Sequence, residues 1–212
     1  MAVRVGCIGL GGMGSRMAAN LQDQGYQLVI FNRSRDQAEA LLRNGATWGK
    51  SPAGTAADVD VLFTMPSRPD AVAVTALGHG GFLSAMRPGS IWVNSSTVKA
   101  SFALRMAKDA RTKGVRYLDA PVSGSEDAAA RGELVFLVGG DTSDLDACRP
   151  LLACMGQIVH VGGHGLGSSP KMVNSLLAAL AALGQSLGVP RQTIFDTFHG
   201  AGDRNGRPPS AG

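Results

Sequence analysis

The sequence predicts an α/β fold, a doubly wound sheet followed by a shortened all-helical segment. Three observations predict it. Short apolar runs alternate with segments of helical periodicity up to Val161, as in βαβ units. A glycine-rich turn follows the first apolar run. From Ser168 the composition changes to an Ala/Leu-rich helical pattern, which predicts a second, smaller part of the chain.

The predicted strands are mostly continuous apolar runs, which suit a parallel sheet covered on both faces. They are Val3–Ile8, Leu28–Phe31, Val59–Thr64, Ile91–Val93, Tyr117–Leu118, Leu134–Val138 and Ile158–Val161. Helices are expected near residues 12–24, 35–44, 69–76, 98–113 and 143–154, most with Ser, Thr or Asp near the start. We therefore assign residues 1–163 to a nucleotide-binding domain, 164–202 to a shortened helical domain and 203–212 to a tail.

Composition and charge exclude several classes of protein. The chain has 212 residues, of which 44% are hydrophobic and 17% charged, so it can bury a core. Its net charge of +4 is concentrated in residues 98–116, where apolar residues at helical spacing indicate a solvated helix face rather than a nucleic-acid site. The longest apolar run, Leu176–Leu183, is far shorter than the ~20 residues of a membrane span. Three cysteines and four histidines without ligand spacing predict neither a disulfide framework nor a metal site. A cytoplasmic location is expected.

The glycine turn Gly9–Gly14 lies between the first predicted strand and a helix, the setting in which G-x-G-x-x-G binds a dinucleotide. Gly9 permits the tight turn, Gly11 lets the backbone approach a pyrophosphate, and Gly14 lets the helix and strand pack closely. The motif therefore predicts a Rossmann-type domain.

The second predicted strand ends in Asn32-Arg33-Ser34, where an NAD-binding domain usually has an Asp or Glu. A guanidinium beside a hydroxyl suits the 2′-phosphate of NADP better than the ribose hydroxyls of NAD. The sequence therefore predicts NADP as cofactor, with NAD less favoured. The alternative is that Arg33 is an ordinary exposed loop residue.

Three further segments complete a pattern. They are Asn94–Thr97, Asp119–Ser125 and Gly165–Ser175. Together with the glycine turn and Asn32–Ser34, they resemble the β-hydroxyacid dehydrogenases, the family of 3-hydroxyisobutyrate dehydrogenase, tartronate semialdehyde reductase and glyoxylate/succinic semialdehyde reductases. The resemblance covers roughly residues 3–202.

The resemblance implies roles for individual residues. Lys171 matches the catalytic lysine and Asn174 the amide beside it, while Ser96, Ser123 and Gly124 match substrate-binding positions. The implied cofactor-binding residues are Gly9, Leu10, Gly11, Gly12, Met13, Gly14, Asn32, Arg33, Ser34, Met65, Pro66 and Thr97. The implied reaction is hydride transfer between the nicotinamide and a short hydroxy acid or semialdehyde, with Lys171 as the acid/base.

Two features depart from the family pattern. Ser175 stands where a second amide usually follows Asn174, and the helical domain is shortened to a connecting helix and one short helix. An apolar helix such as Ser175–Leu183 cannot be left in water, so it must pack on a partner subunit or on its own first domain. Of the two, a homodimer or larger assembly is expected. A second interpretation is a truncated relative without turnover, which acts as a dinucleotide-binding or partner-binding module. A third, imine reductase, is disfavoured by Lys171 and the Ser123-Gly124 turn.

Overall fold

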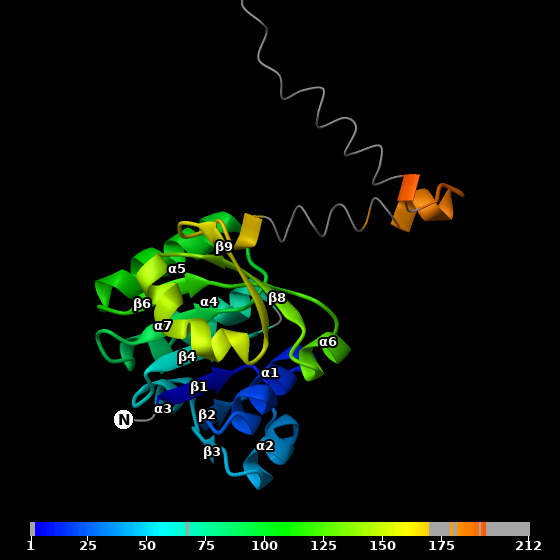
Figure 1. The fold of residues 1–212 in the computed structure, drawn as a ribbon. Helices are drawn as coiled ribbons and strands as arrows, with labels where there is room; N and C mark the ends of the chain where they lie inside the picture. The colour runs from blue at the N-terminus through cyan, green and yellow to red at the C-terminus, as the bar shows by residue number, and fades with distance from the viewer. Residues whose placement is uncertain (1–2, 67, 170–178, 180–181, 191, 194–212) are drawn as a thin grey trace, which may run out of the picture. The chain divides into compact units, whose positions relative to one another are not determined.

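The computed structural model describes residues 3–66, 68–169, 179, 182–190 and 192–193. The chain divides into two compact units, Met1–Lys171 and Met172–Gly212. The first unit is a sheet with helices packed on both of its faces (Figure 1). In the second unit, the described residues 182–186 are helical.

The first unit contains every predicted strand and the five helices predicted before residue 155, whereas the helices predicted after Ser168 lie partly outside the described residues. The strands are β1 (Arg4–Ile8), β2 (Gln27–Phe31), β3 (Thr47–Trp48), β4 (Val61–Thr64), β5 (Ile91–Asn94), β6 (Arg116–Asp119), β7 (Val122–Ser123), β8 (Leu134–Gly139) and β9 (Gly156–Gly162). The helices are α1 (Gly12–Asp23), α2 (Glu39–Arg43), α3 (Pro52–Ala56), α4 (Pro69–Leu77), α5 (Ala100–Thr112), α6 (Glu126–Ala130) and α7 (Thr142–Ala153), with 3-10 helices η1 (Arg35–Ala38) and η2 (Phe82–Ser84). The pattern misses β3, β7, α3, α6 and η2, each of which is too short to show a period.

The sheet has the strand order β3-β2-β1-β4-β5-β6-β8-β7, and β9 pairs with β8. From β3 to β6 all neighbours are parallel. Because the chain winds outward in opposite directions from β1 and β4, a crevice forms outside their carboxyl ends, where ligands bind in open α/β sheets. This topology confirms the predicted Rossmann-type fold.

The sheet is mixed rather than wholly parallel, because β8 runs antiparallel to β6 and β7. The link between β7 and β8, residues 124–133, is shorter than the dozen or more residues that a parallel crossover needs. β6 and β7 both pair with β8, and residues 120 and 121 separate the two paired stretches. Asp119 is the residue at which β6 leaves β5, since it pairs with Asn94 on one side and Gly139 on the other.

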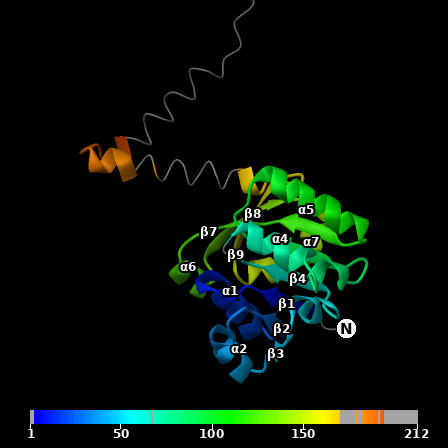
Figure 2. The same cartoon turned by 180° about the vertical axis from the view of Figure 1, so that it is seen from behind.

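Alternation along the strands gives the unit two hydrophobic cores, one on each face of the sheet. On β5, Ile91 and Val93 join the core beneath α1, α2, α6 and α7, whereas Trp92 joins the core beneath α3, α4, α5 and η2. Figure 2 shows the second face, seen from behind. Trp92 is fully buried and makes edge contacts with the rings of Phe82 and Tyr117 at 4.9 and 4.8 Å between centroids. Packing on both faces fixes the parallel strands, so their carboxyl ends lie together at one edge of the sheet.

No helix among the described residues has the length and hydropathy that a membrane span requires.

Candidate functional site

The loops that follow β1, β2 and β4 meet at the carboxyl edge of the sheet. The amide of Gly9 donates to the carbonyl of Phe31 at 3.0 Å, and the amide of Met65 donates to the carbonyl of Ile8 at 2.9 Å. The structure therefore brings together three of the segments that the sequence singles out. These are Gly9–Gly14, Asn32–Ser34 and Met65–Pro66.

The glycine turn is packed on two sides and open on a third. Gly9 has a φ of +92°, and a methyl group there would lie 2.8 Å from the backbone carbon of Met65. A methyl group at Gly14 would collide with the carbonyl oxygen of Gly9, whereas one at Gly11 would meet nothing within 4 Å. Gly11 is also the N-cap of α1, and it makes no side-chain cap hydrogen bond. The open side therefore exposes backbone at a helix N-terminus, which favours an anionic ligand such as a pyrophosphate.

Asn32 ties the glycine turn to the loop after β2. Its Oδ1 accepts a hydrogen bond from the amide of Leu10 at 3.0 Å. Its Nδ2 donates to the carbonyl of Ser34 and to Oε1 of Gln37, both at 2.9 Å. Asn32 is thus a positioning residue that fixes both loops, which adds to the cofactor-binding role that the resemblance implies.

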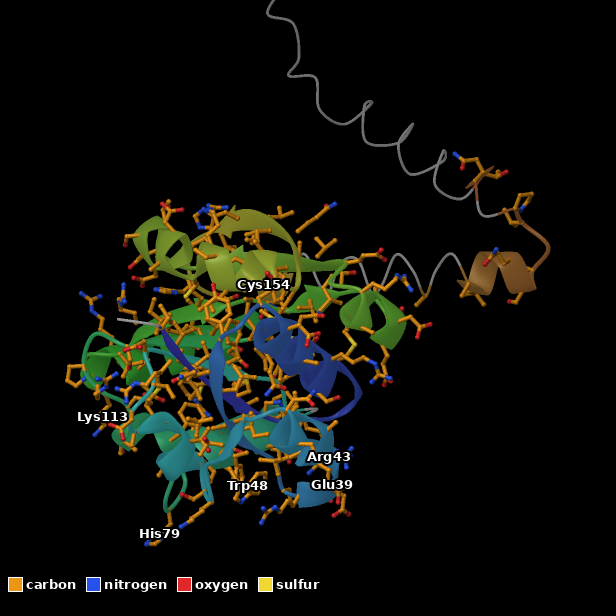
Figure 3. All side chains as sticks on the ribbon, turned by 60° about the horizontal axis from the view of Figure 1, so that its bottom comes forward. Glu39, Arg43, Trp48, His79, Lys113 and Cys154 are labelled. Atoms are coloured by element: carbon orange, nitrogen blue, oxygen red, sulfur yellow. The ribbon has the colours of Figure 1, made fainter. Side chains whose placement is uncertain are left out.

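Arg33 is exposed and has no ion-pair partner among the described residues. Its neighbour Ser34 lies 3.5 Å from Asp36, measured between Oγ and Oδ2. The guanidinium of Arg35 stacks over Trp48, 5.5 Å from the ring centroid. Figure 3 labels Trp48 together with Arg43 of α2, at the end of the unit where β3 borders the sheet. Arg33 therefore places a guanidinium without an ion-pair partner, among the described residues, directly after β2.

A layer of buried polar side chains lies beneath the edge formed by β4, β5 and β6. Trp92 Nε1 donates to Thr64 Oγ1 at 2.8 Å, and Thr64 Oγ1 donates to Asn94 Oδ1 at 3.1 Å. Asn94 Nδ2 then donates to the hydroxyl of Tyr117 at 3.2 Å. Asn94 Oδ1 also accepts from the amide of Ser96 at 3.2 Å, so the layer fixes the start of the loop after β5.

The loop after β5 presents two kinds of side chain. Ser95 and Ser96 are buried, and their hydroxyl oxygens have no hydrogen-bond partner within the described part of the chain. Thr97 is exposed. Buried hydroxyls are normally hydrogen-bonded, so Ser95 and Ser96 are two exceptions at the start of this loop.

The turn at Ser123 and Gly124 links the sheet to α6. Ser123 is half-buried at the end of β7, and Gly124 is exposed with a φ of +141°. Ser125 caps α6, because its hydroxyl accepts from the amide of Ala128 at 3.2 Å. The predicted substrate turn is therefore held at both of its ends.

Helix α6 is fastened to α1 by contacts that the sequence did not predict. Glu126 lies against Gly12 and forms an ion pair with Arg16 at 3.0 Å. Asn20 donates from Nδ2 to the carbonyl of Ala129 at 2.7 Å. Both members of the ion pair are partly exposed, so it contributes little stability by itself. Its consequence is geometric, because it joins the Ser123-Gly124 turn to the helix that begins at the glycine turn.

Asp119, at the end of β6, is fully buried. Its Oδ1 accepts from the amide of Gly165 at 2.9 Å, and its Oδ2 accepts from the amide of Ser168 at 3.1 Å. Burial raises the pKa of this carboxyl from 3.8 to about 6. Asp119 opens the segment Asp119–Ser125, and no individual role was predicted for it; the available signal was a charged residue at the end of an apolar strand.

The predicted catalytic residues Lys171 and Asn174 lie outside the described residues, as does Ser175. No group of three His, Cys, Asp or Glu that could hold a metal ion is found among the residues that are described.

Comparison with known proteins identifies the first unit. Residues 4–163 match the family model of the NAD binding domain of 6-phosphogluconate dehydrogenase. The mouse mitochondrial 3-hydroxyisobutyrate dehydrogenase is 39% identical over 85% of this chain and 54% of its own length. The chain therefore spans about half the length of that curated relative.

Two solved structures are similar over most of the chain. A 3-hydroxyisobutyrate dehydrogenase from Mycobacterium tuberculosis with L-serine is 32% identical, with a TM-score of 0.76 over 94% of this chain and 71% of that one. Psf3 in complex with NADP+ and 2-OPP is 29% identical, with a TM-score of 0.79 over 91% of this chain and 71% of that one.

The glycine turn gives a matched pair of variants. We expect Gly14→Ala to lower the free energy of unfolding by about 1–3 kcal/mol, because its methyl group overpacks against the Gly9 carbonyl. Gly11→Ala should leave the free energy of unfolding near the wild-type value, since its methyl group meets open space. Urea unfolding of the two variants measures both effects. Equal losses of stability would contradict the packing described for the turn.

Proposed function

This chain belongs to the 3-hydroxyisobutyrate dehydrogenase-like β-hydroxyacid dehydrogenases, and from that premise we propose that it transfers hydride between NADP(H) and a short hydroxy acid or semialdehyde. The observation that carries the proposal is the glycine turn, which is tightly packed at Gly9 and Gly14 but open at Gly11. That shape fits a pyrophosphate at the start of α1.

The residues at the end of β2 support NADP as the preferred cofactor. Arg33 is exposed and without an ion-pair partner in the described residues, and Ser34 offers a hydroxyl beside it. A guanidinium and a hydroxyl are suited to a phosphate on the ribose. Asn32 holds this loop against the glycine turn, so the two cofactor-binding segments stay in register with each other. Leu10, Gly12, Met13, Met65, Pro66 and Thr97 complete the proposed cofactor site. When bound, the nicotinamide supplies or accepts the hydride.

The proposed substrate site lies at the neighbouring strand ends. Ser123 and Gly124 would hold the substrate carboxylate with a hydroxyl and a backbone amide, as the family resemblance implies. The buried hydroxyl of Ser96, which has no partner in the described part of the chain, supports a polar substrate group at the end of β5. Short hydroxy acids and semialdehydes that carry a carboxylate have the groups that such a site requires.

Lys171 is the proposed acid/base of the reaction, with Asn174 beside it. In the direction of reduction, its ammonium donates a proton to the substrate oxygen as the carbonyl becomes an alcohol. In the direction of oxidation, the neutral amine accepts that proton. In both directions the nicotinamide handles the hydride and Lys171 handles the proton, so this mechanism needs no metal ion.

We also propose that the protein is a homodimer or a larger homo-oligomer. In the second unit, Leu183 exposes 56% and Leu187 75% of its surface. Large exposed apolar side chains of this kind are typical of a surface that pairs with another copy.

Light scattering at several protein concentrations is expected to give at least twice the monomer mass. A monomer at all concentrations would contradict the assembly.

Arg33→Ala tests the cofactor preference. We expect this change to weaken NADPH binding by roughly 10-fold to 100-fold, because a hydrogen-bonded charge pair contributes about 1.5–3 kcal/mol. NADH binding should change little. Arg43→Ala is the control, since Arg43 is an exposed arginine paired with Glu39 at 3.6 Å. Fluorescence titration with each cofactor measures the dissociation constants. An unchanged NADPH preference in Arg33→Ala would remove Arg33 from this role.

Lys171→Ala tests the chemistry. General acid/base catalysis contributes about 10²- to 10⁴-fold, so NADPH oxidation with glyoxylate or succinic semialdehyde should fall by that factor while NADPH affinity is retained. Lys113→Ala, at the exposed C-cap of α5, is the control. Near-wild-type turnover in Lys171→Ala would falsify the acid/base assignment. NADPH binding without any turnover by the wild type, across a panel of semialdehydes and keto acids, would favour a dinucleotide-binding module instead.

A further inference from the structure

Asp119 occupies a point where three segments of the chain converge. It is the last residue of β6, where the strand leaves β5 and begins to pair with β8. Its carboxylate accepts hydrogen bonds from the amides of Gly165 and Ser168, which lie 46 and 49 residues further along the chain. The segment 163–168 is therefore attached to the sheet through one side chain as well as through its own backbone contacts.

Glycines make this attachment close. A methyl group at Gly139 would lie 2.6 Å from the amide nitrogen of Gly167 and 2.7 Å from Asp119 Oδ1. A methyl group at Gly167 would lie 2.5 Å from the carbonyl oxygen of Leu137 and 2.7 Å from Asp119 Oδ2. The segment thus rests directly on the ends of β6 and β8, with no room for a side chain between the backbones.

The environment of Asp119 is mostly uncharged. In the register of the sheet its neighbours are Asn94 of β5 and Gly139 of β8. The titratable groups that face it are His164, which lowers the pKa of the carboxyl, and Tyr117, whose own pKa Asp119 raises. His164 also lowers the pKa of Asp144 of α7. Asp144 is paired with Arg116 at 3.3 Å.

We propose that Asp119 is the positioning residue of the reaction: its carboxylate fixes the segment 163–168 on the sheet and so sets the place from which the chain continues to Lys171. This proposal rests on the proposed function, because it assigns the purpose of the attachment to the acid/base lysine. Lys171 follows Ser168 by three positions in the sequence. Asp119 acts through the backbone of Gly165 and Ser168 and is not itself placed in contact with substrate.

The attachment depends on the charge state of Asp119. Its pKa in the folded protein is about 6, above the ordinary 3.8. Between those pH values the folded state holds a proton that the unfolded state has lost. The contribution of Asp119 to the free energy of unfolding therefore falls as the pH rises through this window, and it is constant above it. Asp119 can accept freely with both oxygens only above its folded pKa, however, because a protonated carboxyl carries a donor on one of them.

Asp119→Asn tests the proposal, because the amide keeps the shape but turns one acceptor into a donor facing a backbone amide. We expect the amides of Gly165 and Ser168 to lose hydrogen-exchange protection. With NADPH and succinic semialdehyde, kcat should fall on the order of 10-fold to 100-fold while KM for NADPH stays within about twofold. We expect kcat of the wild type to decline below about pH 6, where Asp119 takes up a proton, and this decline should be absent in the variant.

Asp144→Asn is the matched control, since it neutralises a nearby carboxylate whose pKa burial also raises but whose hydrogen bond goes to Arg116 rather than to an amide of the segment. It should keep the exchange protection and the acid decline of kcat. Gly139→Ala is a second variant in case Asp119→Asn does not fold. It displaces the segment without removing the charge, so it should lower kcat and retain the acid decline.

The outcomes separate the two proposals. Retained exchange protection in Asp119→Asn would overturn the attachment. Lost protection with unchanged kcat and pH profile would overturn the positioning role. If the wild type does not oxidise NADPH with any substrate, the proposed function fails and the positioning role fails with it, whereas hydrogen exchange still decides whether Asp119 anchors the segment.

Discussion

Register between parallel strands is the constraint on which the site depends. Ile8 pairs with Phe31 on one side and with Thr64 on the other. Thr64 pairs with Asn94, and Asn94 with Asp119. The last residues of five strands therefore form one row across the sheet, and the loops after β1, β2, β4 and β5 start from that row. A slip of one residue in any strand would move its side chains to the opposite face.

The row is polar over half of its length, and this polarity makes the edge rigid. Thr64 and Asn94 are buried, yet Trp92 and Tyr117 supply hydrogen-bond partners from the level below. An unpaired buried polar group costs about 1–3 kcal/mol, so the network has one arrangement in which its members are satisfied. The loop after β5 inherits that arrangement, because Asn94 also binds the amide of Ser96.

The sequence was sufficient for local features and insufficient for distant pairings. Apolar runs located the main strands, and the glycine turn with Asn32–Ser34 located one end of the site. The antiparallel direction of β8 depends on the short link between β7 and β8. The hydrophobic periodicity of a strand does not reveal its direction in the sheet, so this feature was not predicted. The partners of Asp119 lie 46 and 49 residues away, and Glu126 pairs with Arg16, which lies still further away in the sequence. The roles of Lys171 and Asn174 stay predictions.

Two junctions in the site use the same physical device with different chemistry. At each, a glycine-rich segment lies against a strand end. One short side chain, at that strand end or one residue after it, accepts hydrogen bonds from one or two backbone amides of the segment. Asn32 serves the turn at Leu10, where the side chain must also donate to the carbonyl of Ser34, so an amide with both functions is required. Asp119 faces two amides, and a short acceptor-only carboxylate accepts from both of them, one with each oxygen.

The cost of the carboxylate at Asp119 is a buried charge, which hydrogen bonds only partly offset. A neutral side chain would avoid that cost but leave one backbone amide unpaired. The carboxylate is therefore explained by the geometry of the segment it holds rather than by stability.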